Sequence, residues 1–313
     1  MNGIDIIIVS RNGAKLTLDC IESFYQYHSD IDLHIILVDN CSTDDTVNLV
    51  KERFTDVKII ENSENYGYAK AVNIGFRNSN SDYVIVSNND VIVHESTLKP
   101  LIDLFINDST IGIVGPQQLD GYGNKGLSYE DLPSYISGLR NVLFIDTVSA
   151  VYKKVIEKLG YVTNQKTKDV GYIDGGFMMI RRSAYYSVGG FDEDYFFYTE
   201  EADFCHRLKE NGWRVVFQPN SRVTHFRGGV SEDGGFSKNS IEMLINSKAL
   251  YCKKNLKRTE AIFFLKAMKF RFGIWMIIHL LLANINIFDR IKRKKELHKC
   301  FYKQLELEIE NMN

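Results

Sequence analysis

Proline and cysteine are both scarce in this chain, with 4 prolines and 5 cysteines among 313 residues. So few prolines, together with the absence of any low-complexity stretch, argue against a disordered or linker-rich protein. The cysteines are scattered and form no Cys-x-x-Cys pair, so we expect neither a zinc site nor a disulfide framework, and we expect a reducing compartment. Asp5 introduces an acid where a secretory signal would be basic, so secretion is not expected.

A strong charge of either sign is also missing, because the formal net charge is -2. There is therefore no overall basic field for a nucleic acid, and we expect no nucleic-acid partner. No Gly-x-Gly-x-x-Gly follows the first apolar run, which argues against a dinucleotide-binding Rossmann enzyme. The composition, 44% hydrophobic and 25% charged, is typical of a soluble globular protein with one large or two modest domains.

The first part of the chain alternates β-branched runs with helically spaced apolar residues. The pattern predicts strands at 4–9, 33–38, 57–60, 83–87 and 111–114, and helices at 16–27 and 68–76. A further helix is predicted to start at a Ser42 or Thr43 cap and to end at Phe54, and the fifth strand is predicted to stop at Gly115-Pro116. This order favours an α/β fold whose mostly parallel central sheet has helices on both faces.

The regular pattern weakens between residues 120 and 171, which we interpret as a variable insertion that shapes a second substrate site. After it, the sequence predicts an apolar strand run at 172–182 that is interrupted by Gly175-Gly176. A helix at 200–209, ending at Asn211-Gly212, and short strands at 213–217 and 222–225 follow. Beyond about Ser240 the chain predicts helices rich in apolar and basic residues.

The run Tyr83 to Ser87 ends abruptly in Asn88-Asn89-Asp90. In open α/β sheets, the carboxyl end of a buried strand is where ligands bind. A divalent cation takes oxygen ligands and neutralises a diphosphate, so Asp90 is a candidate metal ligand, with Asn88 beside it. The alternative is a simple turn cap. The acidic triplet Asp192-Glu193-Asp194 follows no buried strand, and we interpret it as a loop.

Two other strand ends carry polar residues. Asp39 ends the second strand and can accept hydrogen bonds from a ribose hydroxyl or a base N–H. Ser10-Arg11-Asn12 follows the first strand, so these side chains would line the same crevice as Asp90. The alternative is that Asp39 and Asn40 are ordinary turn residues.

The segment from Asn65 to Asn73 opens a helix after the third strand. Gly67 allows the backbone to approach a ligand, and a helix N-terminus favours anions. Lys70 can reach a phosphate from this helix. A single glycine is weak evidence for phosphate binding by itself.

Glu200 and Glu201 are adjacent acids at a helix start. Neighbours on a helix point about 100° apart, so one carboxylate can face a cleft, where it is a candidate general base. Acids at this position are also expected from the helix dipole alone. His225, at the end of a short strand, is either a metal ligand or a structural histidine.

Taken in order, these segments resemble the bacterial family 2 glycosyltransferases with a GT-A fold, and most closely their rhamnosyltransferase-like branch, which builds capsule and O-antigen polysaccharides. The resemblance spans roughly residues 4 to 230. The segments that carry it are Ile7 to Asn12, Val38 to Ser42, Asn65 to Gly67, Asn73 to Gly75, Ser87 to Asp90, Asp174 to Met178, Arg181-Arg182, Gly189 to Glu193, Tyr198 to Leu208, Gly212-Trp213 and His225.

The resemblance implies an inverting transfer from a nucleotide-diphosphate sugar, dTDP-rhamnose or a UDP-hexose, to an acceptor hydroxyl. By the same analogy Asp39 contacts the nucleoside, and Asp90 holds Mg²⁺ or Mn²⁺ on the diphosphate with His225 completing the shell. Glu201 stands where the family usually carries its catalytic Asp, and Glu200 matches the acid before it. The segment Asp174-Gly175-Gly176 would line the sugar and acceptor pocket. The chain departs from the family by having Asn88-Asn89-Asp90 in place of Asp-x-Asp or Asn-Pro-Asp.

We therefore predict a GT-A domain at 1–239, with a nucleotide-binding half at 1–116 and an acceptor and catalytic half at 117–239, followed by a helical extension at 240–313. Residues 272–288 carry no Asp, Glu, Lys or Arg and precede the basic run 290–295. An apolar stretch of 17 residues is at the lower limit for spanning a bilayer, so an interfacial helix fits better. A core helix with a solvated basic tail is the alternative. The expected location is cytoplasmic and peripheral on the inner face of the membrane, with a lipid-linked saccharide as acceptor.

Two rival functions remain open at this point. One is a sugar nucleotidyltransferase or other nucleotide-binding α/β enzyme. Such an enzyme needs a basic phosphate-binding loop early in the chain, and Arg11 and Lys15 are weak evidence for one. The other is a non-catalytic carbohydrate-binding subunit that keeps the fold. The sequence leaves the donor sugar, the acceptor and the oligomeric state open.

Overall fold

The computed structural model describes residues 3–145, 147–149, 152, 166–227, 237–283 and 289–312, with the backbone alone at 279–283 and 289–295. The chain divides into two compact units. The first unit comprises residues 1–131 and 166–228, and the second comprises residues 132–165 and 229–313. The sequence-based division into a domain at 1–239, with halves at 1–116 and 117–239, and an extension at 240–313 stays a prediction.

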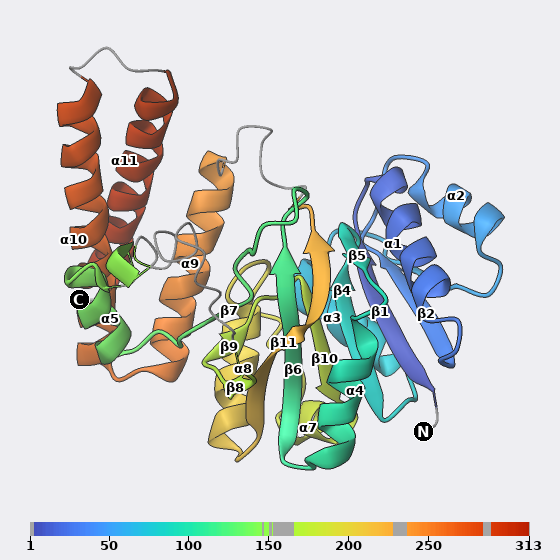
Figure 1. Ribbon diagram of the computed structural model, residues 1–313. Helices are drawn as coiled ribbons and strands as arrows, with labels where there is room; N and C mark the ends of the chain where they lie inside the picture. The colour runs from blue at the N-terminus through green and yellow to red at the C-terminus, as the bar shows by residue number, and fades with distance from the viewer. Residues whose placement is uncertain are drawn as a thin grey trace. The chain divides into compact units, whose positions relative to one another are not determined.

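The first unit alternates strands and helices (Figure 1). In chain order it contains β1 (Ile4–Ser10), α1 (Ala14–Tyr27), β2 (Leu33–Asp39), α2 (Thr46–Arg53), β3 (Lys58–Glu61), α3 (Tyr68–Arg77), β4 (Tyr83–Asn88), β5 (Val91–Val93), α4 (Leu98–Asn107), β6 (Ile111–Leu119), β7 (Tyr129–Glu130), β8 (Lys168–Asp169), β9 (Tyr172–Ile173), β10 (Phe177–Arg181), α7 (Arg182–Ser187), α8 (Glu200–Glu210) and β11 (Arg214–His225).

In the described part of this unit, the strands form one large sheet in the order β3-β2-β1-β4-β10-β6-β11-β5, with β8 added on β11. The neighbours β3, β2, β1 and β4 are parallel, β10 runs antiparallel between β4 and β6, and β11 is parallel to β6. A separate two-stranded ribbon joins β7 and β9. The α/β fold with a mostly parallel sheet is therefore confirmed.

Both faces of the sheet are buried under helices, as the alternation along β1 shows. Ile6 and Ile8 belong to the same buried apolar cluster as Phe24 of α1 and Leu101 of α4. Ile7 points to the opposite face, where it meets Gly75 of α3. Successive residues of a strand face opposite sides, so a strand covered on both sides reads as a continuous apolar run.

Three local predictions are corrected by the structure. The strand predicted to stop at Gly115-Pro116 continues as β6 to Leu119. Its neighbour β10 pairs with β6 only as far as Val114, so beyond that point β6 has one partner fewer and tolerates a proline. The two short strands predicted at 213–217 and 222–225 are one strand, β11, with a register shift between Gln218 and Arg222.

The third correction concerns the start of α2. This helix begins at Thr46 rather than after a Ser42 or Thr43 cap. The Ser42 side chain instead bonds Asp39 and accepts a hydrogen bond from the backbone of Asn12. A short polar side chain readily forms hydrogen bonds with nearby backbone in this way. Ser42 therefore stabilises the loop before α2 and does not cap the helix.

The second unit contains α5 (Tyr135–Val142), α9 (Lys238–Asn255), α10 (Arg258–Ala283) and α11 (Asp289–Glu310). The helices α10 and α11 pack through Phe272 and Phe301, whose rings stack at 4.4 Å, and through a 2.7 Å ion pair between Lys269 and Glu306. The predicted interfacial segment falls partly in α10, while its residues 284–288 lie outside the described residues. Among the helices that the structure describes, none is long and apolar enough to cross a bilayer.

Candidate functional site

The carboxyl ends of β1, β2 and β4 stand level at one edge of the sheet. In the parallel register Ser10 is opposite Asp39, and Val9 is opposite Asn88. Three of the predicted positions therefore meet at the same edge, as expected for neighbouring parallel strands.

A chain of hydrogen bonds links the β2 end to the β4 end. The Asp39 carboxylate accepts from the Ser42 backbone N–H at 2.9 Å, and Ser42 Oγ accepts from the Asn12 N–H at 2.7 Å. The Asn12 carbonyl in turn accepts from the Asn89 amide at 3.1 Å. Asn89 therefore turns its amide nitrogen toward the loop after β1, and this nitrogen also donates to Thr17 of α1 at 3.0 Å. This geometry gives Asn89 a structural role beside Asp90.

The N-terminus of α1 is filled by a side chain of the protein itself. Asp44 accepts hydrogen bonds from the backbone N–H groups of Gly13 and Ala14, at 2.8 and 3.3 Å. The hydroxyl of Thr46 also donates to this carboxylate, and these bonds lower its pKa. Arg11 is exposed beside this turn. A helix end already occupied by a carboxylate does not offer the free anion site that a phosphate loop requires.

Asn40 was not singled out by the sequence beyond its turn propensity, yet it organises the entry to α3. Its amide donates to Asn65 at 2.8 Å and to the Gly67 carbonyl at 3.1 Å. Its carbonyl oxygen accepts from the Tyr66 backbone at 3.0 Å. Asn65 and Gly67 are thus held against the β2 end. Lys70 lies with its ammonium 3.8 Å from the centre of the Tyr66 ring.

Packing at the start of α3 requires a glycine at position 67. Its φ is 78°, and a Cβ there would overlap the backbone carbonyl of Phe196. The next N–H, that of Tyr68, donates to that same carbonyl at 2.7 Å. The loop before α8 is therefore clamped directly onto the start of α3.

Asn73 also serves this clamp. Its amide donates to the Phe191 carbonyl at 2.8 Å and to Glu193 at 3.0 Å, while its oxygen accepts from the Tyr185 hydroxyl at 2.7 Å. The structure uses Asn73 to hold the loop after α7, so it is not brought to the sheet edge with Asp90.

Asp90 and His225 lie side by side, both nearly buried. Asp90 Oδ1 is 3.2 Å from His225 Nε2, and the other ring nitrogen, Nδ1, is 2.8 Å from Gln118 Oε1. Gln118 Nε2 donates to the Asp174 carbonyl at 3.3 Å, which fixes its oxygen toward the histidine. Nδ1 therefore donates to Gln118 Oε1, and this hydrogen bond holds the ring with Nε2 facing Asp90.

Asp174 joins this cluster from the turn between β9 and β10. Its carboxylate accepts from the Gly176 N–H at 3.2 Å and from Arg227 at 3.3 Å. Gly176 is needed because a Cβ at this position would overlap the His225 ring. The Gly176 carbonyl accepts from the Asn88 N–H at 3.0 Å, which ties this turn to the β4 end.

The two glutamates begin α8 behind two residues with left-handed backbone. Tyr198 and Thr199 both have φ of 70°, a conformation that non-glycine residues seldom adopt outside functional or tightly held turns. Glu200 is buried at 4% exposure, and burial together with the neighbouring Glu201 raises its pKa well above its usual range. Glu201 is half-buried and faces Gly175, where an added Cβ would lie 3.8 Å from its carboxyl carbon.

Tyr68 shows that these acids surround one space. Its buried hydroxyl donates to the Gly175 carbonyl at 2.8 Å. The sequence pattern marked it only as the first helical residue of α3. Burial raises its pKa well above the usual range, and so do four carboxylates that face it: Glu200, Glu201, Asp174 and Asp90.

The donor set of Asp90 and His225 fits a small divalent cation. Two ligands about 2.1 Å from an octahedral ion and 90° apart lie about 3.0 Å from each other, close to the separation seen here. Among the described residues there is no group of three or more His, Cys, Asp or Glu that could hold a metal. Mg²⁺ commonly takes one or two protein ligands and completes its shell with water and substrate phosphates.

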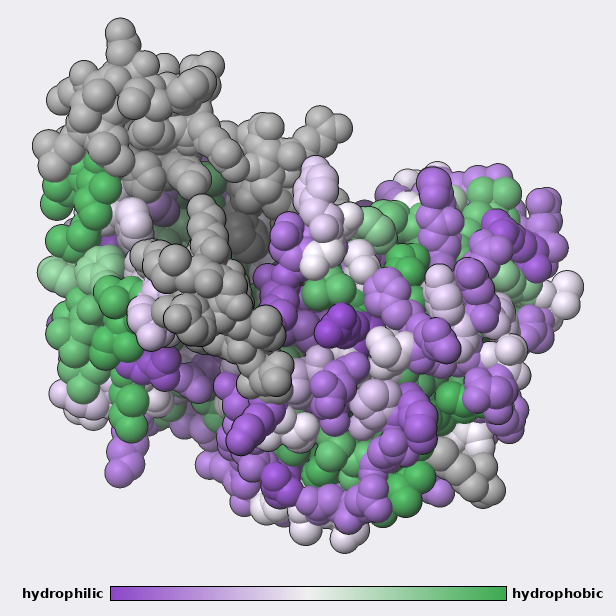
Figure 2. All heavy atoms as spheres, viewed as in Figure 1, coloured by the Kyte–Doolittle hydropathy of each residue, from purple (hydrophilic) through white to green (hydrophobic). Residues whose placement is uncertain are grey.

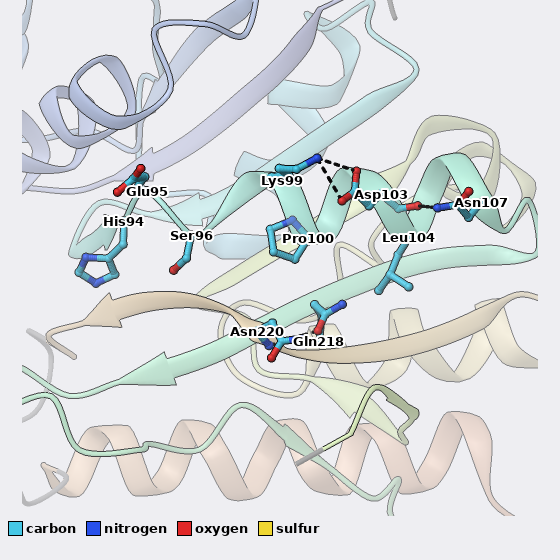
Figure 3. Close-up of a pocket in the computed structure, with 10 residues that line it drawn as sticks. All are labelled: His94, Glu95, Ser96, Lys99, Pro100, Asp103, Leu104, Asn107, Gln218 and Asn220. Atoms are coloured by element: carbon cyan, nitrogen blue, oxygen red, sulfur yellow. Dashed lines mark hydrogen bonds and ion pairs between the residues drawn. The ribbon is translucent and has the colours of Figure 1, made fainter. Parts of the chain in front are cut away.

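A groove of about 720 Å³ lies elsewhere on the first unit (Figure 3). It runs along α4 and the register shift of β11, and none of the predicted site residues lines it. Its lining includes an ion pair between Lys99 and Asp103 at 3.4 Å. The groove is separate from the cluster around Asp90.

The sequence matches known protein families along most of its length. Residues 5–189 match the model described as glycosyl transferase family 2, and residues 140–239 match that of glycosyl transferase family group 2. The chain belongs to glycosyl transferase family 2. Family 2 membership confirms the resemblance expected from the sequence motifs.

Relatives within family 2 include a rhamnosyltransferase. The N-acetylglucosaminyl-diphospho-decaprenol L-rhamnosyltransferase of Mycobacterium tuberculosis is 31% identical over 209 residues, which are 62% of this chain and 66% of that protein. The low-salt glycan biosynthesis hexosyltransferase Agl10 of Haloferax volcanii is 24% identical over 221 residues, 69% of this chain and 64% of that protein. This family 2 chain therefore spans just under two thirds of the length of these relatives.

Solved structures share the fold at low identity. A mannosyltransferase from Pyrobaculum calidifontis, in complex with GDP-Man and Mn²⁺, has a TM-score of 0.59 and 15% identity, covering 97% of this chain and 86% of its own. GalNAc-T7, solved with UDP, GalNAc and Mn²⁺, has a TM-score of 0.57 and 15% identity, covering 99% of this chain and 56% of its own. These likenesses confirm the GT-A fold.

Proposed function

We propose that this protein is an inverting, metal-dependent glycosyltransferase that moves a sugar from a nucleotide-diphosphate sugar to a hydroxyl of a saccharide acceptor. The observation that carries the proposal is the pairing of Asp90 with His225 at 3.2 Å, close to Tyr68, whose pKa is raised by burial and by Glu200, Glu201, Asp174 and Asp90. Membership of family 2 supports the reaction class.

Asp90 and His225 are the residues that would hold Mg²⁺ or Mn²⁺. A cation bound there supplies charge neutralisation for the diphosphate leaving group. The Mn²⁺ in the two similar GT-A structures supports this assignment by fold. The Gln118 contact contributes by fixing the His225 ring so that Nε2 faces Asp90.

Glu201 is our choice for the general base. Burial and the neighbouring Glu201 raise the pKa of Glu200, which favours its protonated form and makes Glu201 the better candidate. Glu201 is more exposed and lies across from Gly175, where an acceptor hydroxyl can approach.

The reaction forms one bond and breaks one. The acceptor oxygen bonds to the anomeric carbon from the side opposite the diphosphate, while the bond from that carbon to the phosphate oxygen breaks. Glu201 takes the proton from the acceptor oxygen, and the nucleoside diphosphate leaves with the bonding electron pair. Attack from the opposite side inverts the anomeric configuration.

Asp39 is proposed to contact the nucleoside of the donor, because it is held at the sheet edge by Ser42. Ser10, Asn12 and Asn65 frame the same edge, and Lys70, whose ammonium lies over the Tyr66 ring, is proposed to meet a phosphate of the donor. The mycobacterial relative's name supports dTDP-rhamnose as donor and a lipid-linked saccharide as acceptor, with a UDP-hexose as the second possibility. An acceptor of this kind supports a peripheral position on the cytoplasmic face of a membrane.

A panel of sugar nucleotides tests this function. The purified chain should release nucleoside diphosphate from one donor, with dTDP-rhamnose and the common UDP-hexoses tried first. Release of pyrophosphate instead would support a sugar nucleotidyltransferase, which the filled N-terminus of α1 disfavours. Donor binding without release under any metal condition would leave a non-catalytic carbohydrate-binding subunit.

A further inference from the structure

The second unit carries an apolar surface that the proposed chemistry does not use. On α5 and at its C-cap, Ile136, Leu139 and Leu143 are 71%, 40% and 63% exposed. Their spacing places all three on one face of the helix. Ile145 and Val148 continue the exposed apolar run at 43% and 65%. We call these five residues the apolar ridge.

The opposite side of α5 is firmly held on α10. The Tyr135 ring stacks on Phe263 at 4.2 Å, and the Tyr135 N–H donates to Glu260 at 2.8 Å. Arg271 donates to the Asn141 side chain at 2.6 Å. The helix start is closed by a capping box between Ser134 and Ser137. The apolar ridge is therefore displayed by an anchored helix, not by a frayed end.

Such a surface is unusual for a protein that meets only water. Single exposed apolar residues are normal, but contiguous ones mark an interaction site. Figure 2 shows hydrophobic residues gathered over α5 and α10. On α10, Phe270 and Ile277 add two more side chains that are 50% and 52% exposed, and the exposed Lys266 lies one turn before Phe270.

The charge of the chain is divided unevenly between the two units. The second unit has 20 Lys and Arg against 11 Asp and Glu, a formal charge of +9, and the first has 18 against 29, or -11. The net charge of -2 hides this division. Because the second unit is basic and displays the apolar ridge, it complements an anionic lipid surface. Two copies that met through their second units would instead bring like charges together.

We propose that the apolar ridge is the surface through which this protein binds an anionic membrane. The ridge side chains enter the boundary between headgroups and acyl chains, and the basic residues of the second unit neutralise lipid phosphates. The sequence pattern pointed to residues 272–288 for this contact, which stays a prediction; the exposed apolar residues that carry the present proposal lie on α5 and after it. The proposal refines the membrane position given under the proposed function but does not depend on the transfer reaction.

Co-sedimentation of the full chain with vesicles tests the proposal. The vesicles are phosphatidylcholine alone or phosphatidylcholine with about 30% phosphatidylglycerol. The wild type should pellet with the anionic vesicles and much less with the neutral ones, and raising NaCl from about 50 to about 500 mM should weaken the binding. The triple variant Ile136→Ser/Leu139→Ser/Leu143→Ser should bind at least about tenfold more weakly.

The matched control is Ile106→Ser/Leu307→Ser, which removes side chains that are 64% and 53% exposed outside the ridge. It should pellet like the wild type, and both variants should keep the wild-type circular dichroism and nucleoside diphosphate release. Equal vesicle binding by the triple variant and the wild type would overturn the proposal, as would no binding by the wild type. So would a wild-type dimer, seen by light scattering, that the triple variant converts to a monomer without any change in vesicle binding. Loss of donor turnover in all variants would contradict the proposed glycosyltransferase function and would leave the proposed membrane-binding surface unaffected.

Discussion

Gly176 and the imidazole of His225 lie in such close contact that a methyl group on Gly176 would overlap the ring. Gly176 also accepts the Asn88 N–H at 3.0 Å, so it cannot retreat without disturbing the β4 end. His225 faces Asp90 at 3.2 Å through its other side. The glycine therefore determines how close the histidine can come to the acid.

Gly176→Ala should displace His225 and disable the proposed metal site while leaving the fold intact. A misplacement of about 1 Å costs about a hundredfold in rate, so kcat should fall by about that factor. Steady-state kinetics with the preferred donor, beside thermal melting, measures the effect. Gly126→Ala is the control, because an added Cβ there meets only ordinary contacts. Unchanged kcat in Gly176→Ala would remove His225 from the site.

Glu201→Gln should abolish transfer, with a loss of about 10² to 10⁴ in kcat, because the amide cannot accept the acceptor proton. Nucleotide affinity should stay near wild type. Glu200→Gln is the matched control: a neutral amide resembles the protonated carboxyl, so this variant should keep most of its activity. Calorimetric titration with nucleoside diphosphate and turnover assays separate the two effects. If Glu200→Gln is the inactive variant, the base is Glu200.

The buried Glu200 should also make stability depend on pH. In the unfolded chain a glutamate titrates near about 4.3, and in the native state its pKa is raised. Between these two values the native state binds more protons than the unfolded state, so the free energy of unfolding falls as pH rises. Glu200→Gln removes this term, and its advantage over wild type should grow by up to about 1.4 kcal/mol per pH unit above about pH 4.3.

Urea unfolding at a series of pH values measures this difference. Glu95→Gln replaces an exposed carboxylate of the same unit and should change stability by less than about 0.5 kcal/mol. A constant difference between Glu200→Gln and wild type across the series would show that the pKa of Glu200 is the same in the native and unfolded states.

Chelation should stop nucleoside diphosphate release, and added Mn²⁺ or Mg²⁺ should restore it. Asp90→Ala should bind Mn²⁺ about tenfold or more weakly in the presence of nucleoside diphosphate, measured by calorimetry, because it removes a charged oxygen ligand. Asp194→Ala, from the acidic triplet interpreted as a loop, should bind the ion like wild type. Full activity in excess EDTA would remove the metal role of Asp90.

Strand ends were the most predictable part of the candidate site. Asp39, Ser10 and Asn88 could be placed together from sequence because parallel strands that follow one another along the chain bring their carboxyl ends to one edge. The family motifs placed Glu201 and His225 in the same site, by resemblance. Their roles remain proposals.

Other residues could not be assigned from sequence because their partners are distant in the chain. Asn89 and Asn73 were predicted to bind the donor, which stays a prediction, and the structure adds that each also holds a loop. Gln118 was overlooked because Gly115-Pro116 predicted the end of a strand that continues to Leu119. Tyr68 looked like an ordinary first residue of a helix, and only the fold surrounds it with carboxylates.

Local sequence by itself determined the order of strands and helices, the family, and the acids at the strand ends, because apolar periodicity and short motifs are properties of neighbouring residues. Only the tertiary structure decided that Gln118 orients His225 toward Asp90 and that α5 displays its apolar face outward. Those relationships join residues more than a hundred positions apart or depend on which face of a helix is covered. Tertiary packing decides these relationships, and no local pattern in the sequence encodes that packing.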